Sequence, residues 1–294
     1  MAAIAQTGTA GRRRQPAGQR STGRWTIMPA TYLVAIVALG LTVVPLLLVV
    51  VNGFRTNGDI NNNAAGLPSP WVAGNYTAIL KSAQFWELIA NSTLVSVVAT
   101  ALVLVFGTMA ALALSQYQFK GREFFYNVFV AGLLFPITAA AVPVYLELQR
   151  LGLLDNQFGV ALPEAAFGLP LTMIILRPFL RAIPGELREA ALVDGASRFR
   201  YFVQILLPLA KPALVTVGLL AFVTNWNQYF LPLLVLQTQS HYTLPLGTYM
   251  FQTSYSQNVA GIFAYSAMAM LPALGAFVYA ERYLVAGAAG AVKG

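Results

Sequence analysis

Six apolar stretches, each of about twenty residues or more, constrain this chain more than any other feature of its sequence. A bilayer core about 30 Å thick is crossed by roughly 20 apolar residues in an α-helix, and an isolated strand could not satisfy its backbone polar groups in lipid. Only 10% of the 294 residues are charged, against about 25% in a typical soluble domain. The sequence therefore predicts an all-α membrane protein with six transmembrane helices, at residues 27–51, 89–114, 124–146, 158–180, 213–236 and 262–285.

These stretches also define the expected organisation of the chain. The first is too long for the apolar core of a signal peptide, about 7–15 residues, so we expect it to remain in the mature protein. The basic tail before it, poor in apolar residues, is expected to be disordered; it either marks the topology or touches anionic lipid headgroups. The expected regions are a tail at 1–26, the first helix at 27–51, an external loop with a short surface helix at 52–84, a transmembrane core at 85–286 and a second tail at 287–294.

The basic residues predict the orientation. Of the 18 lysines and arginines, all but Arg55, Lys81 and Arg150 fall in the tails, in alternate loops on one side of the six stretches, or at the ends of stretches on that side. Loops rich in Lys and Arg stay in the cytoplasm. Both termini are therefore expected to be cytoplasmic, which agrees with an even number of spans, and the positive net charge indicates topology rather than nucleic-acid binding.

Several classes of active site have no support in the sequence. There is no Gly-Lys-Ser/Thr phosphate-binding loop and no cysteine. The single histidine, His241, lies in an expected external loop, and no cluster of His, Asp and Glu has metal-ligand spacing. We therefore expect neither an enzyme nor a metal or cofactor site in this chain.

The cytoplasmic loop at residues 183–208 carries the most informative pattern. Pro184 suits a first helical turn, and Gly195 is placed to end that helix in the left-handed conformation. Ser197 can cap a second short helix, which Pro208 is expected to stop or kink. Both helices have apolar faces although they lie in the cytoplasm, so we expect a protein partner to cover them.

Within this loop Glu189-Ala190-Ala191 is followed after three residues by Gly195, and nine residues later by Ile-Leu-Leu-Pro at 205–208. This spacing resembles the EAA motif of permeases from binding-protein-dependent ABC importers. Residues 183–184, 194–197, 225–227 and 290–294 resemble the sugar-importer branch, the MalG-like permeases. The resemblance extends from about Asn75 to the C-terminus.

The resemblance implies a type I importer permease, a multi-pass protein of the bacterial cytoplasmic (inner) membrane. Its implied partners are membrane lipid, a second homologous permease, two ATPase subunits that bind ATP and magnesium, and an external binding protein that delivers a sugar, either a di- or an oligosaccharide. No catalytic residue is implied. The residues implied to couple to the ATPase are Glu186, Leu187, Glu189, Ala190, Ala191, Asp194, Gly195, Ser197 and Phe199.

Polar residues inside the fifth stretch are candidates for the substrate pathway. Asn225, Gln228 and Tyr229 share one face of a helix, and an aromatic ring such as that of Trp226 suits the apolar face of a sugar. These amides either line the pathway or bond to neighbouring helices, a common use of polar groups in membranes. The candidate pathway residues are Asn225, Trp226, Asn227, Gln228, Tyr229 and Glu164.

Glu164 is the deepest acidic residue in the expected spans. An intramembrane carboxylate indicates a functional site, but its side chain could also reach the outer headgroups. A secondary, ion-coupled carrier is the alternative function, and Glu164 is the one candidate for its coupling carboxylate. Pro136 and Pro143 in the third stretch predict exposed backbone carbonyls at a bend or a packing contact.

Overall fold

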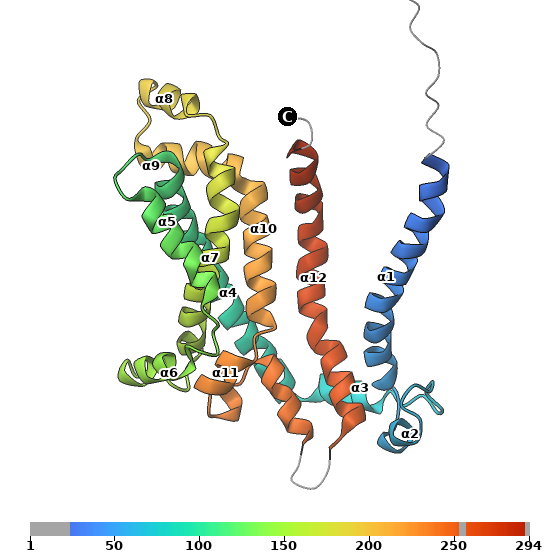
Figure 1. The fold of residues 1–294 in the computed structure, drawn as a ribbon. Coiled ribbons are helices and arrows are strands. Elements are labelled where there is room, and N and C mark those ends of the chain that lie inside the picture. Colours follow the sequence, from blue (N-terminus) through green and yellow to red (C-terminus); the bar gives the residue numbers. More distant parts are fainter. Residues whose placement is uncertain (1–23, 253–256, 292–294) are drawn as a thin grey trace, which may run out of the picture. The chain divides into compact units, whose positions relative to one another are not determined.

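The computed structural model describes residues 24–252 and 257–291, and over these residues its regular secondary structure is helical, without a strand. The chain divides into two units, residues 1–47 and 48–294. Residues 1–23 of the tail that was expected to be disordered lie outside the described residues. Figure 1 shows the helices α1 (Arg24–Asn52), α2 (Asn57–Asn62), α3 (Gly74–Lys81), α4 (Ala83–Gln116), α5 (Arg122–Ala131), α6 (Ala141–Arg150), α7 (Gln157–Arg181), α8 (Glu186–Val193), α9 (Arg198–Tyr201), α10 (Leu207–Trp226), α11 (Phe230–Val235) and α12 (Val259–Ala291).

Shorter helical turns complete the chain between these helices. They are the 3₁₀ helices η1 (Gly132–Leu134), η3 (Gln239–His241) and η4 (Leu244–Phe251), and the π-helix η2 (Phe202–Leu206).

Among the described residues, five helices are long and apolar enough to cross a membrane. They lie at Thr31–Asn52, Ala83–Gln116, Gln157–Arg181, Arg198–Trp226 and Val259–Glu281. Five of the six expected spans are therefore confirmed as long helices. The C-terminal tail, expected from residue 287, is helical as far as Ala291.

The third expected span, residues 124–146, is not one helix. α5 passes into η1, and Phe135 then takes an extended conformation (φ −91°, ψ 105°), the conformation favoured for a residue that precedes proline. The Gly132 carbonyl, expected to be left free by Pro136, accepts a hydrogen bond from the Phe135 N–H. Pro143 sits in the first turn of α6, where no intrahelical N–H bond is lost. The chain nevertheless passes from one end of unit 2 to the other between α5 and α6 (Figure 1).

Close packing of α4 against α7 forms the centre of unit 2. A Cβ atom on Gly168 of α7 would lie 2.8 Å from Val103 of α4, and one on Gly107 of α4 would overlap the methyl group of Thr172. Small residues at such positions let two membrane helices approach closely. α10 packs beside both helices and shares their buried cluster, which includes Val95, Ala99, Val160, Met173, Leu176, Ala213 and Val217.

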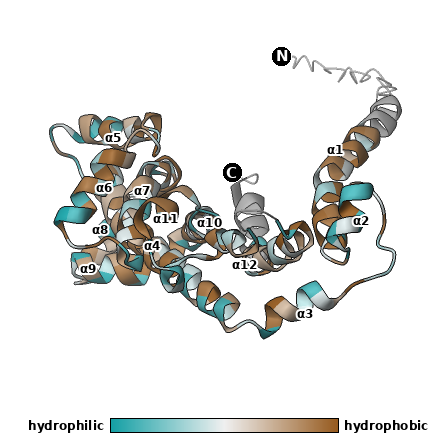
Figure 2. Ribbon diagram, turned by 90° about the horizontal axis from the view of Figure 1, so that it is seen from below, coloured by the Kyte–Doolittle hydropathy of each residue, from teal (hydrophilic) through white to brown (hydrophobic). Residues whose placement is uncertain are grey.

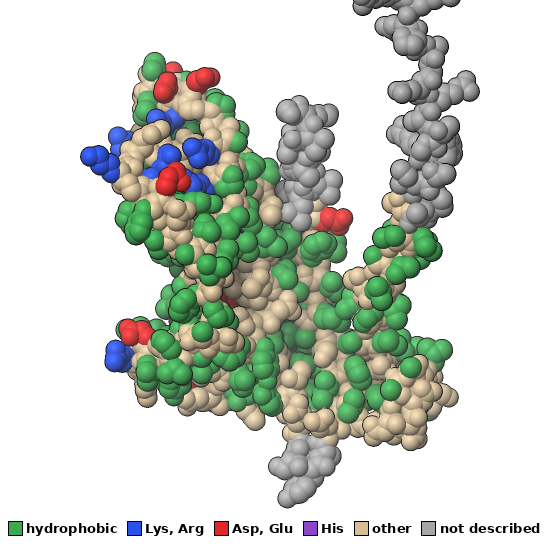
Figure 3. All heavy atoms as spheres, viewed as in Figure 1, with side chains coloured by type: hydrophobic (Ala, Val, Ile, Leu, Met, Phe, Trp, Pro, Cys, Tyr) green, Lys and Arg blue, Asp and Glu red, His purple; other side chains and the backbone are tan. Residues whose placement is uncertain are grey.

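Arg177 joins three helices near one end of this core. Its Nε donates to the Leu114 carbonyl of α4 at 3.0 Å, its guanidinium pairs with Glu123 of α5, and it lies 3.9 Å from the ring centroid of Tyr126. Buried charges require such paired environments. Figure 3 shows further basic side chains gathered at this end, over α8 and α9.

The opposite end of unit 2 is held by hydrogen bonds from side chains to other side chains and to the backbone. Arg55 is fully buried and donates to Asp59, Asn52 and the carbonyl of Asn63, which orders the chain around α2. The expected external loop thus contains two short helices, α2 and α3, instead of one.

Asp155 joins two loops at this same end. Its carboxylate accepts hydrogen bonds from the backbone N–H groups of Gln237 and Thr238 and lies 3.2 Å from Nδ1 of His241. Desolvation alone would raise the pKa of Asp155, but the hydrogen bonds from Thr238, Gln237 and His241 outweigh it and hold that pKa well below its ordinary value.

We expect the Asp155 contacts to stabilise the protein at neutral pH and to be lost in acid. A carboxyl group with a depressed native pKa contributes its full stabilisation above its ordinary pKa of 3.8 and loses it progressively as the pH falls from there through the lowered native pKa. Asp155→Asn should therefore lower the thermal unfolding midpoint at pH 7, with a smaller difference from the unmodified protein at about pH 2. Tryptophan fluorescence of the detergent-solubilised protein would measure both midpoints.

Glu147→Gln is the matched control, since Glu147 makes only an exposed ion pair with Arg150 at 3.8 Å, and such pairs contribute little. An equal deficit of Asp155→Asn at both pH values would show that the carboxylate charge is not the stabilising feature.

Candidate functional site

The loop after α7 forms two short helices, as the sequence predicts. Gly195, two residues after the end of α8, has φ +79°. The Ala196 N–H donates to the Ala191 carbonyl, and the Gly195 N–H donates to the Leu192 carbonyl. This is the Schellman arrangement, and its left-handed residue favours glycine. The Ser197 hydroxyl accepts a hydrogen bond from the Arg200 N–H and caps α9.

Most of the predicted coupling residues lie at the surface of these two helices. Ala191 is the exception: it is buried in the core cluster of its own chain, so the apolar face of α8 is turned partly inward. Apolar side chains are exposed beside them, and Val193 and Phe199 are 87% and 74% exposed. We call this the α8–α9 surface; it comprises Glu186, Leu187, Glu189, Ala190, Leu192, Val193, Asp194, Gly195, Ser197 and Phe199.

The α8–α9 surface is attached firmly to the helical core. Arg188 of α8 donates to the Gln116 carbonyl at the end of α4, and the Gln116 side chain donates in turn to the Leu180 carbonyl of α7. Tyr201 of α9 is buried beneath them. Arg188, Gln116 and Tyr201 were not identified from the sequence, because contacts between distant helix ends leave no local pattern.

α9 continues into α10, in the fourth of the five long helices, without a break. Pro208 does not stop the helix; the turn before it opens into the π-helix η2, in which the Leu207 N–H donates to the Phe202 carbonyl five residues earlier. π-Turns of this kind accommodate local irregularity inside a helix. Residues Arg198–Trp226 therefore form one continuous helical stretch.

A cavity of about 170 Å³ lies between α4, α7 and α10 and is closed on one side by η1. It brings together Glu164, Asn225 and Gln228, three of the predicted pathway residues, from two different helices and the turn after α10. Further lining residues were not predicted. Those on α7 and α10 recur every three or four residues, which is the repeat of one helix face, but this repeat does not show which face lines a cavity. The further lining residues are Val103, Leu133, Ile137, Phe167, Gly168, Leu171, Thr172, Ile175, Val217, Leu220, Ala221 and Thr224.

Glu164 is almost fully buried in the wall of this cavity. Its side chain is 3% exposed, and neither carboxylate oxygen has a hydrogen-bond partner. The alternative that it reaches the outer headgroups is therefore wrong. Asn225 is also buried, and its Nδ2 likewise has no partner. Among the described residues, no three His, Asp or Glu side chains are grouped so that they could hold a metal ion.

The other predicted pathway residues lie outside this cavity. α10 ends at Trp226, so the segment after it is not the continuous helix expected through residue 236. Trp226 donates from its indole to the Ala269 carbonyl of α12, and Asn227 donates to Val223 of its own helix. The Tyr229 hydroxyl bonds to that of Tyr249.

Gln228 supplies a cap at this break. Its Oε1 accepts hydrogen bonds from the N–H groups of Tyr229 and Phe230 as α11 begins. Trp226 thus bonds to a neighbouring helix, whereas the bonds of Asn227 and Gln228 are to backbone groups within four residues of each in sequence and are not the contacts between helices that formed one of the two alternatives.

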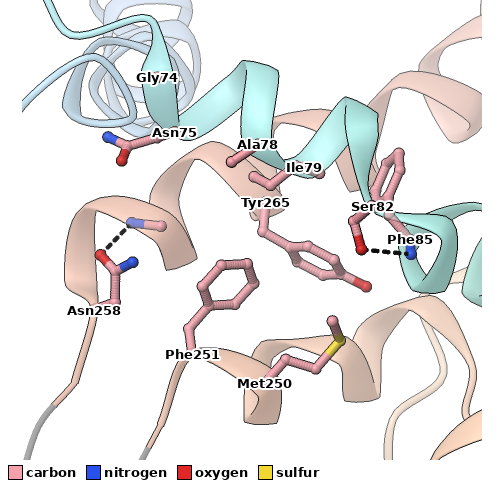
Figure 4. Close-up of a pocket in the computed structure, with 11 residues that line it drawn as sticks. Gly74, Asn75, Ala78, Ile79, Ser82, Phe85, Met250, Phe251, Asn258 and Tyr265 are labelled. Carbon is pink, nitrogen blue, oxygen red and sulfur yellow. Dashed lines mark hydrogen bonds between the residues drawn. The ribbon is translucent and has the colours of Figure 1, made fainter.

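A second cavity, of about 210 Å³, lies between α3, the start of α4 and α12. Figure 4 shows the rings of Phe251 and Tyr265 pointing into it beneath Ile79. Its polar groups are bonded within the chain: the Tyr265 hydroxyl donates to the Leu244 carbonyl, and Asn75 donates to the Gly53 carbonyl. This cavity therefore offers a mainly apolar surface, without the unpartnered groups found around Glu164.

Comparison with known proteins identifies the class of the chain. Residues 103–281, more than half of the chain and including all residues of the Glu164 cavity and the α8–α9 surface, match the family described as "Binding-protein-dependent transport system inner membrane component". The diacetylchitobiose uptake system permease protein NgcG of Streptomyces coelicolor is 35% identical over 244 residues, which cover 82% of this chain and 81% of that protein. The arabinooligosaccharides transport system permease protein AraQ of Halalkalibacterium halodurans is 32% identical over 259 residues, or 86% and 92% of the two chains.

A solved structure agrees with these relatives. In the crystal structure of a bacterial ABC transporter involved in the import of the acidic polysaccharide alginate, one chain superposes with a TM-score of 0.74 at 25% identity, covering 92% of this chain and 99% of that one. The family match and the curated relatives together show that the chain belongs to the binding-protein-dependent transport system inner membrane components and is a transmembrane permease of the sugar ABC-transporter group.

Proposed function

We propose that the chain is one of two permeases in an ATP-driven importer and forms half of the pathway for a di- or oligosaccharide delivered by an external binding protein. The exposed α8–α9 surface carries this proposal. Its apolar side chains, including Val193 and Phe199, lie at the end of the core where basic residues gather. Exposed apolar patches of this kind mark interaction sites, and the partner proposed for this one is the ATPase.

The continuous helix from Arg198 to Trp226 supplies a route for coupling. One end of it contributes Phe199 to the α8–α9 surface, and the other contributes Asn225 to the cavity. A displacement imposed on α9 by closure of the ATPase pair would therefore move the cavity wall, switching it between two packed arrangements. ATP and magnesium would bind to the ATPase subunits rather than to this chain.

We further propose that the chain lies in the bacterial inner membrane, crosses it six times and has both termini in the cytoplasm. Five of these crossings are the long helices. The remaining one, third in chain order, is the segment from α5 through η1 to α6, which links the two ends of unit 2 (Figure 1). Irregular backbone at membrane depth is tolerated where protein covers it or where it lines a cavity. Leu133 and Ile137 line the cavity, while the exposed Leu134 and Phe135 are proposed to face the second permease.

The family membership favours this importer over an ion-coupled carrier. Several relatives are named as permeases of oligosaccharide or disaccharide transport systems, among them the trehalose transport system permease protein SugB of Mycobacterium tuberculosis, 28% identical over 280 residues. A further solved alginate transporter, similar in fold, is in complex with a pentasaccharide-bound periplasmic protein. These systems support a sugar as the substrate proposed here.

Reporter fusions test the orientation. Fusions at Gly23, Gln118 and Gly195 should report the cytoplasm, and fusions near Asn62, Asp155 and Gln252 should report the outside, because basic loops stay inside. Paired activities of an alkaline phosphatase fusion and a fluorescent-protein fusion at each site measure this. An external location for Gly195 would refute the coupling role of the α8–α9 surface.

Variants of α8 test the coupling role. Gly195→Val forces a β-branched residue into a left-handed conformation, with strain of about 1–2 kcal/mol, and Glu189→Lys reverses a charge on the exposed surface. Each should reduce co-purification of the ATPase and sugar-stimulated ATP hydrolysis severalfold, while the permease still inserts. Gly185→Ala is the control, since Gly185 has φ −63° and open space at its Cβ position. Normal ATPase attachment and uptake in both variants would exclude coupling through this surface.

Variants of the cavity test the substrate pathway. Asn225→Leu removes an unpartnered amide and should raise the KM for uptake about threefold to tenfold, the effect of losing one hydrogen bond. Gln228→Leu should do the same and also lower stability, because it removes the cap on α11. Thr216→Val, which removes only a bond to Pro212 within α10, should leave uptake unchanged. Unchanged uptake kinetics in Asn225→Leu would show that this amide does not meet the substrate.

A further inference from the structure

The Glu164 carboxylate has no internal partner. Glu164 lies two turns into α7. Its side chain is only 3% exposed, and both carboxylate oxygens lack a hydrogen-bond donor. No lysine or arginine is among the residues that line the cavity. A carboxylate held in an apolar wall without donors or a counter-charge is unfavourable by several kcal/mol. Its ionised form is therefore favoured only when what enters the cavity supplies the donors.

The polar groups around Glu164 complement the hydroxyls of a sugar. An ionised carboxylate only accepts hydrogen bonds, through two oxygens, so it can take the O–H donors of two neighbouring hydroxyls. Asn225 presents its unpartnered Nδ2, a donor that an acceptor oxygen on the same molecule can use. Thr224 and Gln228 line the same cavity.

The remaining wall suits the carbon skeleton of a sugar ring. Phe167, Leu171 and Leu220 are apolar and line the cavity beside the polar groups. The volume of about 170 Å³ is smaller than the roughly 300–1,000 Å³ of sites that enclose drug-sized ligands. The cavity is thus of a size for one ring of a chain that moves past it, and not for an entire oligosaccharide.

We propose that Glu164 determines substrate specificity in the pathway: its ionised carboxylate binds the hydroxyl or ammonium groups of neutral and amino sugars and repels sugars that carry a carboxylate. This inference rests on the proposed transport function and names the substrate class that the function admits. A like charge beside Glu164 is disfavoured because the cavity has few groups to screen it.

Thiol labelling tests the charge without knowledge of the natural substrate. The chain contains no cysteine, so Thr224→Cys places a single thiol of this chain in the cavity wall. The complete transporter, reconstituted in vesicles, is treated with trimethylammonium-ethyl or sulfonato-ethyl methanethiosulfonate, and labelling of this chain is measured by mass spectrometry. We divide the labelling rate of the cationic reagent by that of the anionic reagent. We expect this ratio to be at least about tenfold higher for Thr224→Cys than for free glutathione.

The matched variants identify the source of that preference. Glu164→Gln in the Thr224→Cys background should return the ratio of rates to the glutathione value, whereas Glu147→Gln, on the exposed surface of α6, should leave the preference intact. A preference unaffected by Glu164→Gln overturns the proposal. Absence of labelling from either side of the membrane also overturns it, because the carboxylate would then not face the pathway.

Protection by sugars tests the selectivity itself. Three β-1,4-linked disaccharides of one size serve as probes: cellobiose, its diamino analogue and its monocarboxylate analogue. At a concentration of about twice their Kd, the neutral and amino sugars should slow labelling of Thr224→Cys about threefold, because the rate falls with occupancy of the cavity, and the carboxylate should slow it only in the Glu164→Gln variant. Equal protection by all three sugars with Glu164 present overturns the proposal. A charge preference without protection by any sugar refutes the proposed sugar pathway and leaves Glu164 as a selector of cations.

Discussion

Gly107 and Gly168 let α4 and α7 approach more closely than any side chain at those positions would allow. The other elements of unit 2 depend on this contact. α10 packs against both helices, and Arg177 and Gln116 bond across their ends on the side of α8. Beyond the opposite end of the contact, Gln157 of α7 donates to Asn91 of α4 at 3.3 Å. In a membrane, where lipid gives helices no hydrophobic reason to associate, close packing and hydrogen bonds of this kind hold them together.

Two sets of polar groups in this helical core differ in their bonding, apart from hydroxyl groups such as those of Ser96 and Thr100, which also lack a partner. Arg177, Trp226 and Ser92 are bonded to groups of the chain itself, and these bonds join helix to helix or helix to loop. Glu164 and Asn225 are buried without partners in the wall of one cavity. Because an unpartnered buried polar group is unfavourable, the second set indicates a site that is completed by a ligand, whereas the first set is structural.

Interruptions of the helices are also placed where they matter for transport. The extended residue Phe135 lies between Leu133 and Ile137, which both line the cavity, and Gln228, another lining residue, follows the end of α10 at Trp226. The π-helix before Pro208 has the opposite effect, since it keeps α9 and α10 continuous. The proposed coupling surface and the proposed substrate site are thus joined by one uninterrupted helix.

Local features of this structure were determined by the sequence alone. Apolar length identified five of the helices, Gly195 and Ser197 defined the end of α8 and the start of α9, and the EAA spacing identified the family. Each depends on residues within a few turns of one another. The presence of Glu164 and Asn225 in the wall of one cavity, the burial of Ala191 and the broken third span were decided by tertiary structure. They depend on which helix faces lie together. Two apolar helices of similar composition carry no local signal that selects those faces. Between α4 and α7 the close fit of glycine against bulkier side chains selects the faces that meet.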